Sequence, residues 1–161
     1  MSGVRLHIEL GAQRLRWHGP RGASRSYPIS SGAAGAGERD GSGGTPRGRH
    51  VVRARIGAGA DPMTVFVGRR PTGERWSPEL AAAQPGRDWI LGRILWLCGR
   101  EPGRNRFGAV DTMRRYIYIH GTPPDQPLGV PASHGCIRMA CADVVDLFER
   151  TPVGSEVQID A

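Results

Sequence analysis

Two segments decide how this chain folds: Tyr116-Ile117-Tyr118-Ile119-His120-Gly121-Thr122 and, after a short loop, Ser133-His134-Gly135-Cys136-Ile137-Arg138-Met139. In the first, isoleucines alternate with tyrosines and a histidine, which predicts a strand with Tyr116, Tyr118 and His120 on one face. The second brings a thiol, an imidazole, a hydroxyl and a guanidinium together, and a helix is predicted from Ala142 to Arg150. This is the layout expected for a cysteine nucleophile held beside a histidine base.

Alternation of apolar residues predicts strands along the rest of the chain. Residues 89–98 are apolar enough for a core strand or a short helix, and Gly92 and the flanking turns favour the strand. One helical turn is expected at 79–83. The other predicted strands are a hairpin at 4–10 and 15–17, an edge strand at 26–30, strands at 50–56 and 63–68, and a last one containing Val157 and Ile159. The prediction is one domain over residues 1–161, mainly β with one or two short helices.

Two stretches fall outside this pattern. Residues 31–48 are glycine-rich and lack the Gly-Lys-Ser/Thr of a phosphate-binding loop, so we predict a flexible connector. Residues 69–89 are expected to form an irregular insertion that covers one rim of the sheet, with Trp76 and Trp89 as packing residues. Cys98 is predicted to be a buried small hydrophobe.

Every one of the 22 basic residues is arginine, and the formal net charge is +7. The absence of lysine excludes a Schiff-base lysine, a Ser-Lys dyad and a Walker phosphate loop. The positive charge favours an anionic partner such as a cell-wall polymer, acidic lipid or nucleic acid, or it simply solvates the surface. No basic motif studded with aromatic residues indicates specific nucleic-acid binding. No segment has the length of a transmembrane span, and no signal peptide is visible.

A useful cysteine nucleophile needs a lowered pKa, which a neighbouring histidine and a helix N-terminus provide. Cys136 has both in the predicted arrangement, and Gly135 lets the backbone turn tightly beside it. The consecutive amides from His134 to Cys136 are candidates for an oxyanion hole. His120 is favoured over His134 as the base, because the end of a strand is a more rigid platform. The carbonyl of Gly121 is a candidate to orient His120.

A zinc site built from His120, His134, Cys136 and Cys141 is the alternative for the same residues. The His-x-Cys spacing is poor for structural zinc, and Cys141 falls where the helix begins. We therefore predict nucleophilic catalysis without a metal or a cofactor.

The segment Ile119-His120-Gly121-Thr122, followed by Ser133-His134-Gly135-Cys136-Ile137-Arg138-Met139, resembles the signature of the L,D-transpeptidase (YkuD-type) catalytic domain. The opening hairpin, Tyr27-Pro28-Ile29-Ser30, Thr45-Pro46-Arg47-Gly48 and the helix after the cysteine agree with it, so the resemblance spans nearly the whole chain. It implies a β-sandwich or barrel-like domain.

The resemblance also assigns roles. It implies that Cys136 is the acylated nucleophile and His120 its base, oriented by the Gly121 carbonyl. The amides of His134, Gly135 and Cys136 would form the oxyanion hole. In the substrate-binding part, Ser133 would support the loop, and Arg138 would meet a carboxylate of a peptide stem.

The activity implied by the resemblance is attack on the carbonyl of the third residue of a peptidoglycan tetrapeptide stem, with release of D-alanine. An amine acceptor then resolves the thioester to give a 3→3 cross-link, whereas water would make the protein an L,D-carboxypeptidase. Carbapenem-type β-lactams are expected as acylating inhibitors. The family chemistry places such enzymes in the cell envelope or periplasm, and a cytoplasmic role stays open because no export signal is visible. A non-catalytic, arginine-rich binding module ranks lowest.

Overall fold

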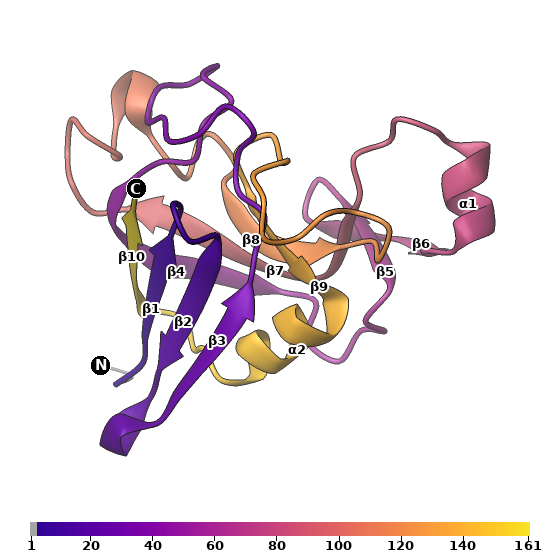
Figure 1. Cartoon of the computed structure of the whole chain (residues 1–161), viewed down its shortest axis with the longest axis horizontal. Helices are drawn as coiled ribbons and strands as arrows, with labels where there is room; N and C mark the ends of the chain where they lie inside the picture. The colour runs from indigo at the N-terminus through magenta and orange to yellow at the C-terminus, as the bar shows by residue number, and fades with distance from the viewer. Residues whose placement is uncertain (1–2) are drawn as a thin grey trace.

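The computed structural model describes residues 3–161, which form one curled, half-barrel sheet with two α-helices (Figure 1). The mainly β fold predicted from the sequence is confirmed. The strands are β1 (Arg5–Glu9), β2 (Arg14–His18), β3 (Ser24–Pro28), β4 (Gly48–Ile56), β5 (Thr64–Val67), β6 (Arg70–Arg75), β7 (Ile90–Gly99), β8 (Tyr118–Thr122), β9 (Ile137–Ala140) and β10 (Glu156–Asp160). The helices are α1 (Pro78–Ala83) and α2 (Cys141–Glu149), with short 3-10 turns η1 (Pro20–Gly22) and η2 (Gly108–Val110). Neither α-helix within residues 3–161 combines the length and apolar character needed to cross a bilayer.

Strand β7 joins the two parts of the sheet. The strand order is β3-β2-β1-β10-β4-β7-β5-β6, and β8 branches off β7 and pairs in parallel with β9. β7 can contact several partners because it bends: its register against β8 shifts between Leu91 and Ile94. Gly92 lies in this bend with a φ of +79°, and a Cβ there would be 2.7 Å from the carbonyl oxygen of Pro62. The interruption of the apolar run by a glycine therefore marks a bulge within a strand.

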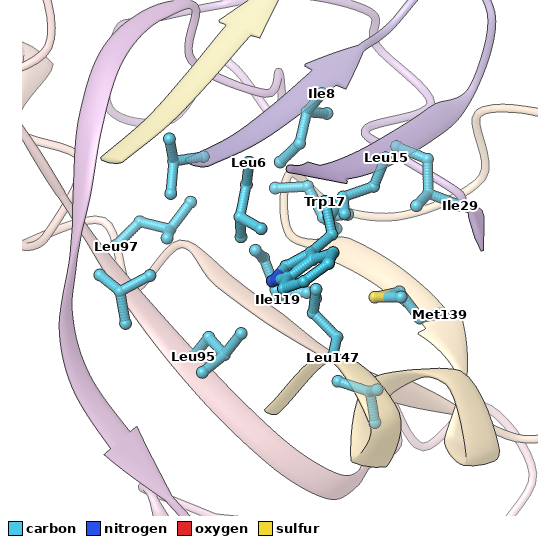
Figure 2. Packing of buried hydrophobic residues seen from close by; sticks show 14 of the residues in the cluster. Leu6, Ile8, Leu15, Trp17, Ile29, Leu95, Leu97, Ile119, Met139 and Leu147 are labelled. Carbon is cyan, nitrogen blue, oxygen red and sulfur yellow. The ribbon is translucent and has the colours of Figure 1, made fainter. Parts of the chain in front are cut away.

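The main core lies inside the curl of the sheet and is closed by α2 (Figure 2). Alternation along each strand supplies the inward-facing residues, and α2 contributes one buried stripe containing Val144, Leu147 and Phe148. The indole of Trp17 packs in this core and donates a hydrogen bond to the carbonyl of Arg150 (3.1 Å), which fixes the hairpin against the end of α2. The core residues labelled in Figure 2 are Leu6, Ile8, Leu15, Trp17, Ile29, Leu95, Leu97, Ile119, Met139 and Leu147.

Three local predictions are wrong. The strand expected from Tyr116 begins at Tyr118, because Tyr116 has a φ of +57° and lies in the preceding turn, half-exposed. Residues 69–89 are more regular than expected: β6 pairs antiparallel with β5 and extends the sheet, and α1 confirms the helical turn. Cys98 is only half-buried.

The glycine-rich segment 31–48 is also not a flexible connector. Its beginning is fixed by Gln13, whose side chain accepts a hydrogen bond from the Ser31 amide (3.0 Å) and donates one to the Ser31 hydroxyl (2.6 Å). Its middle is fixed by Arg115, whose guanidinium donates to the carbonyls of Gly37 (2.9 Å) and Gly44 (2.7 Å). The glycines allow close packing of backbone on backbone in this segment.

Thr45 joins this segment to the loop that precedes β9. Its buried hydroxyl accepts from the amide of Gly32 (2.9 Å) and donates to the carbonyl of Gly135 (2.9 Å). A Cβ on Gly135 would lie 3.1 Å from the Gly44 carbonyl oxygen, so the two segments are in contact along their backbones. The glycine-rich segment therefore packs against the loop of residues 133–136 and supports its conformation.

We expect Thr45→Val to lower the free energy of unfolding by about 1–3 kcal/mol, because it leaves the Gly32 amide and the Gly135 carbonyl buried without a partner. Urea denaturation of the purified domain measures this. Thr72→Val is the matched control, since the Thr72 hydroxyl bonds only to Glu74 at an exposed site and should change stability by less than about 0.5 kcal/mol. Equal effects of the two substitutions would contradict the bridging role of Thr45.

Candidate active site

The parallel pair β8–β9 brings both sequence motifs onto one face. Ile119 pairs with Ile137 and His120 with Arg138, and the two isoleucines point into the main core. Side chains one residue along point the other way, so His120 and Arg138 share the opposite face. Cys136 immediately precedes β9 and shares that face. With strands about 4.8 Å apart and a rise of about 3.3 Å per residue, the Cα atoms of His120 and Cys136 are diagonal neighbours about 8 Å apart.

Backbone groups on both sides hold the thiol of Cys136. The amide of Tyr118 donates to Sγ (3.3 Å), and Sγ–H donates to the carbonyl of Tyr116 (3.3 Å). The turn at Tyr116, which the sequence did not predict, therefore presents its carbonyl to the Cys136 thiol. The side chain of Cys136 is half-buried and packs next to Tyr118 and Ile94.

The electrostatics of the thiol differ from the sequence-based expectation of a lowered pKa. Burial raises the pKa of Cys136 to about 11, although the hydrogen bond from the Tyr118 amide acts in the opposite direction and lowers the pKa. The charges of Arg138 and Arg115 also oppose the rise. The expected help from a helix N-terminus is absent, because β9 separates Cys136 from the start of α2. A pKa of about 11 makes the Cys136 side chain a neutral thiol at neutral pH.

His120 is buried and is oriented by its neighbour in sequence. Its Nδ1 lies 2.7 Å from the Gly121 carbonyl oxygen, which assigns the proton to Nδ1 and leaves Nε2 as a proton acceptor. Burial lowers the pKa of His120, although the hydrogen bond to the Gly121 carbonyl favours the charged ring. The imidazole is thus neutral at neutral pH, as a general base must be.

The absence of a side chain at Gly121 helps to position the carbonyl that orients His120. A Cβ on it would lie 2.6 Å from the carbonyl oxygen of Leu91 and 3.0 Å from the sulfur of Cys141. Only a glycine lets β8 approach β7 and α2 this closely at the position that orients His120.

His134, the competing candidate base, is placed differently. Its side chain is 79% exposed, and Nδ1 is 3.6 Å from the carboxylate of Asp88. His134 projects from the loop into solvent, whereas His120 is buried within the sheet.

The three backbone amides proposed for an oxyanion hole are not equivalent. The amide of Gly135 donates to the hydroxyl of Ser133 (3.1 Å), and that hydroxyl donates to the carbonyl of Cys136 (2.6 Å). Ser133 therefore braces the loop, and the Gly135 amide is already used. The amides of His134 and Cys136 make no hydrogen bond within residues 3–161, so they are the ones available to an oxyanion.

Arg138 is buried and already paired. Its guanidinium donates to Asp88 (3.1 Å) and to the carbonyl of Ala132 (3.3 Å). Asp88 is half-exposed, so a substrate carboxylate would compete with it for Arg138. These groups line a cavity of about 420 Å³ beside the thiol loop, together with Arg87, Trp89 and Asp125.

On the other side of Cys136 lies an aromatic group with an arginine over it. The guanidinium of Arg69 is 4.9 Å from the ring centroids of both Trp96 and Tyr116, and it donates to the hydroxyl of Tyr118 (3.0 Å). Such cation–π contacts hold the Arg69 guanidinium over the two aromatic rings. The loop that carries Cys136 therefore borders the charged cavity through Ala132 and His134, whereas Cys136 itself packs against the cluster that contains Tyr118.

Sequence reasoning missed Asp88 and Arg115. Asp88 belongs to an irregular segment without a motif, and Arg115 is one arginine among 22 basic residues, so neither gave a signal. Thr45 did give one, through the weak Thr-Pro-x-Gly motif.

The zinc alternative finds no support in the geometry. Cys141 is buried at the start of α2 with its sulfur 3.5 Å from the carbonyl oxygen of Thr122. No group of three potential metal ligands comes together in the part of the chain that the structure describes.

Comparison with known proteins gives one consistent result. The family model of the L,D-transpeptidase catalytic domain (YkuD) matches residues 3–159. The chain is 46% identical over 96 residues to the probable L,D-transpeptidase YbiS of Escherichia coli K12, covering 59% of this chain and 31% of YbiS. It thus spans about a third of the length of this curated relative.

Solved structures show the same fold at low identity. An L,D-transpeptidase from Mycobacterium smegmatis superimposes with a TM-score of 0.59 at 18% identity, covering 99% of this chain and 59% of that one. The L,D-transpeptidase LdtMt1 in complex with imipenem superimposes with a TM-score of 0.57 at 18% identity, covering 98% of this chain and 59% of that one.

The neutral thiol predicts a distinctive pH profile. We expect the rate of Cys136 alkylation by iodoacetamide to be low at neutral pH and to rise with a midpoint near the thiol pKa of about 11, because only the thiolate reacts. Peptide mass mapping separates Cys136 from Cys98 and Cys141 in the same sample. A rate that reaches its plateau at neutral pH would show a thiolate–imidazolium pair instead.

Proposed function

Because the chain belongs to the L,D-transpeptidase catalytic domain family, we propose that it is a cysteine acyltransferase acting on the stem peptides of peptidoglycan. The observation that carries the proposal is the shared face of β8 and β9, which presents Cys136, His120 and Arg138 together, with Arg138 also lining the neighbouring cavity. This substrate would place the reaction in the cell envelope.

The first half-reaction forms the acyl-enzyme. The sulfur of Cys136 attacks the carbonyl carbon of the third stem residue while its proton passes to Nε2 of His120. The carbonyl oxygen becomes an oxyanion facing the free amides of His134 and Cys136. When the tetrahedral intermediate collapses, the peptide C–N bond breaks, and the amine of D-alanine leaves with the proton from the imidazolium.

The second half-reaction runs the same steps with an amine acceptor. His120 takes a proton from the incoming amine, which attacks the thioester carbon. The C–S bond breaks, the sulfur recovers its proton, and a 3→3 cross-link remains. The same acyl-enzyme attacked by water would give an L,D-carboxypeptidase product, and analysis of the released peptides distinguishes the two.

The neutral resting pair suits this scheme. A thiol whose pKa is raised by burial does not react in the absence of substrate, and a histidine whose pKa is lowered stays ready to accept its proton. The oxidation-prone thiolate then exists only while a carbonyl is bound.

The proposal also covers β-lactams of the carbapenem type. The neighbour LdtMt1 is described in complex with imipenem, and the present chain shares its fold. A strained lactam carbonyl presented to Cys136 would acylate it as the lactam C–N bond breaks, and the resulting amine would take up the proton and stay attached to the acyl group.

We expect incubation with imipenem to give a covalent adduct on Cys136 that intact-protein mass spectrometry detects and that is absent from Cys136→Ala. His120→Ala should slow acylation by roughly 100-fold or more, the usual contribution of a general base. His134→Ala, at an exposed position, is the matched control and should slow it by less than about tenfold. Circular dichroism shows whether both variants are folded. Equal losses in two folded variants would contradict the assignment of His120.

The Asp88–Arg138 pair gives a second prediction. Asp88→Asn leaves Arg138 without a carboxylate partner, so we expect the KM for a tetrapeptide stem to fall several-fold while kcat changes less. The same substitution removes a negative charge that raises the pKa of Cys136, so the alkylation midpoint should move to lower pH. An unchanged KM in the folded variant would show that Arg138 does not meet the substrate carboxylate.

A further inference from the structure

A second cavity, of about 460 Å³, lies on the outer face of the sheet, away from the candidate active site. It is bordered by strands β1, β2, β4 and β10, which lie together at the opposite end of the molecule from α1 (Figure 1). None of its lining residues belongs to the cysteine site or to the cavity beside it. The lining is Arg5, Leu6, His7, His18, Arg49, His50, Arg100, Glu156, Val157, Gln158 and Asp160.

The strand register explains why basic side chains gather here. Leu6 and Val157 point into the core, so their neighbours in sequence point outward. Arg5 lies between His18 of β2 and Glu156 of β10. On the far side, Arg49 pairs with Gln158, and the amide of Arg100 donates to the Arg49 carbonyl (2.9 Å). Three arginines from distant parts of the sequence therefore border one hollow.

The guanidiniums of Arg5, Arg49 and Arg100 are exposed and make no ion pair or side-chain hydrogen bond within residues 3–161. Other arginines near the sheet are ion-paired, as in the contact of Arg47 with Glu38 (2.7 Å). A free cation cluster of this kind is costly through self-repulsion unless an anion binds it.

The acidic side chains of the cavity do not neutralise the three arginines. Asp160 is already held by His7 (2.9 Å) and by the side-chain amide of Gln158 (2.9 Å). Glu156 is the one carboxylate of the lining without such a partner. The three arginines and the two carboxylates of the lining leave the cavity with one net positive charge when its histidines are neutral.

We propose that Arg5, Arg49 and Arg100 form a binding site for a phosphate group. Guanidiniums bind oxyanions through paired hydrogen bonds, and a carboxylate would satisfy only one of the three, whereas a phosphate offers more oxygens and more charge. Apart from Leu6 and Val157, which are buried, every side chain of the lining is polar or charged, so the cavity fits a phosphate on a soluble molecule or polymer rather than a lipid surface. Such a site would hold an anionic polymer at a distance from the reacting carbonyl.

Titration calorimetry with inorganic phosphate at low ionic strength tests the proposal. We expect the wild type to bind phosphate and the triple variant Arg5→Gln/Arg49→Gln/Arg100→Gln to bind it at least tenfold more weakly. Because all three side chains are exposed, the variant should unfold at the same temperature as the wild type, which calorimetric scanning verifies. Arg53→Gln is the matched control: Arg53 is exposed on the same strand as Arg49 but outside the cavity, and its loss should leave the affinity unchanged.

Four results would overturn the proposal. Equal affinity of the wild type and the folded triple variant would place phosphate elsewhere. An equal loss in Arg53→Gln would show a dependence on net charge alone. Acetate binding as tightly as phosphate at matched ionic strength would indicate a carboxylate site. In a sedimentation assay, retention on phosphatidylglycerol vesicles that excess inorganic phosphate does not reverse would show a lipid surface as the ligand.

Discussion

The arrangement of the molecule depends on the parallel pairing of β8 with β9. Two successive parallel strands need a crossover of a dozen or more residues, which in most folds is a helix packed on the sheet. Here the crossover, residues 123–136, is a loop, and its last four residues carry the thiol and its bracing serine. The loop keeps its shape because Ser30 exchanges backbone hydrogen bonds with Arg138 (2.9 and 2.8 Å) and because Thr45 holds Gly135. The active-site geometry is thus set by the way in which the chain returns to the sheet.

The same pairing fixes which side chains meet. Because the register joins His120 to Arg138, the imidazole and the guanidinium project side by side, and Cys136 lies two residues before Arg138 on the same face. A slip of β9 by one residue would turn Cys136 and Arg138 into the core and turn Ile137 away from it. The contacts that bury the two isoleucines therefore stabilise the fold and also fix the register that aligns the site.

Much of the fold could be predicted from the sequence, because strand and helix patterns are local. The hairpin and helix α2 followed from the spacing of apolar residues, and the edge strand containing Pro28 and strand β7 followed from proline, glycine and turn signals beside that spacing. Tyr116 was misplaced because its pattern continues that of the strand, whereas its left-handed backbone is imposed by tertiary contacts. The 31–48 segment was misjudged because its order comes from partners far away in sequence, Gln13 and Arg115. The thiol pKa and the Asp88–Arg138 pair depend on burial and on contacts across the fold, which spacing does not encode.

The position of β10 has a consequence for biosynthesis. This strand lies between β1 and β4, so it joins the N-terminal hairpin to the rest of the sheet, although the ribosome makes it after every other strand. Until then, β1 keeps an unpaired edge, a state that promotes pairing with other chains. The contacts that complete the sheet are also those with the greatest separation along the chain, which slows folding. We therefore expect the nascent domain to need chaperones until β10 has left the ribosome.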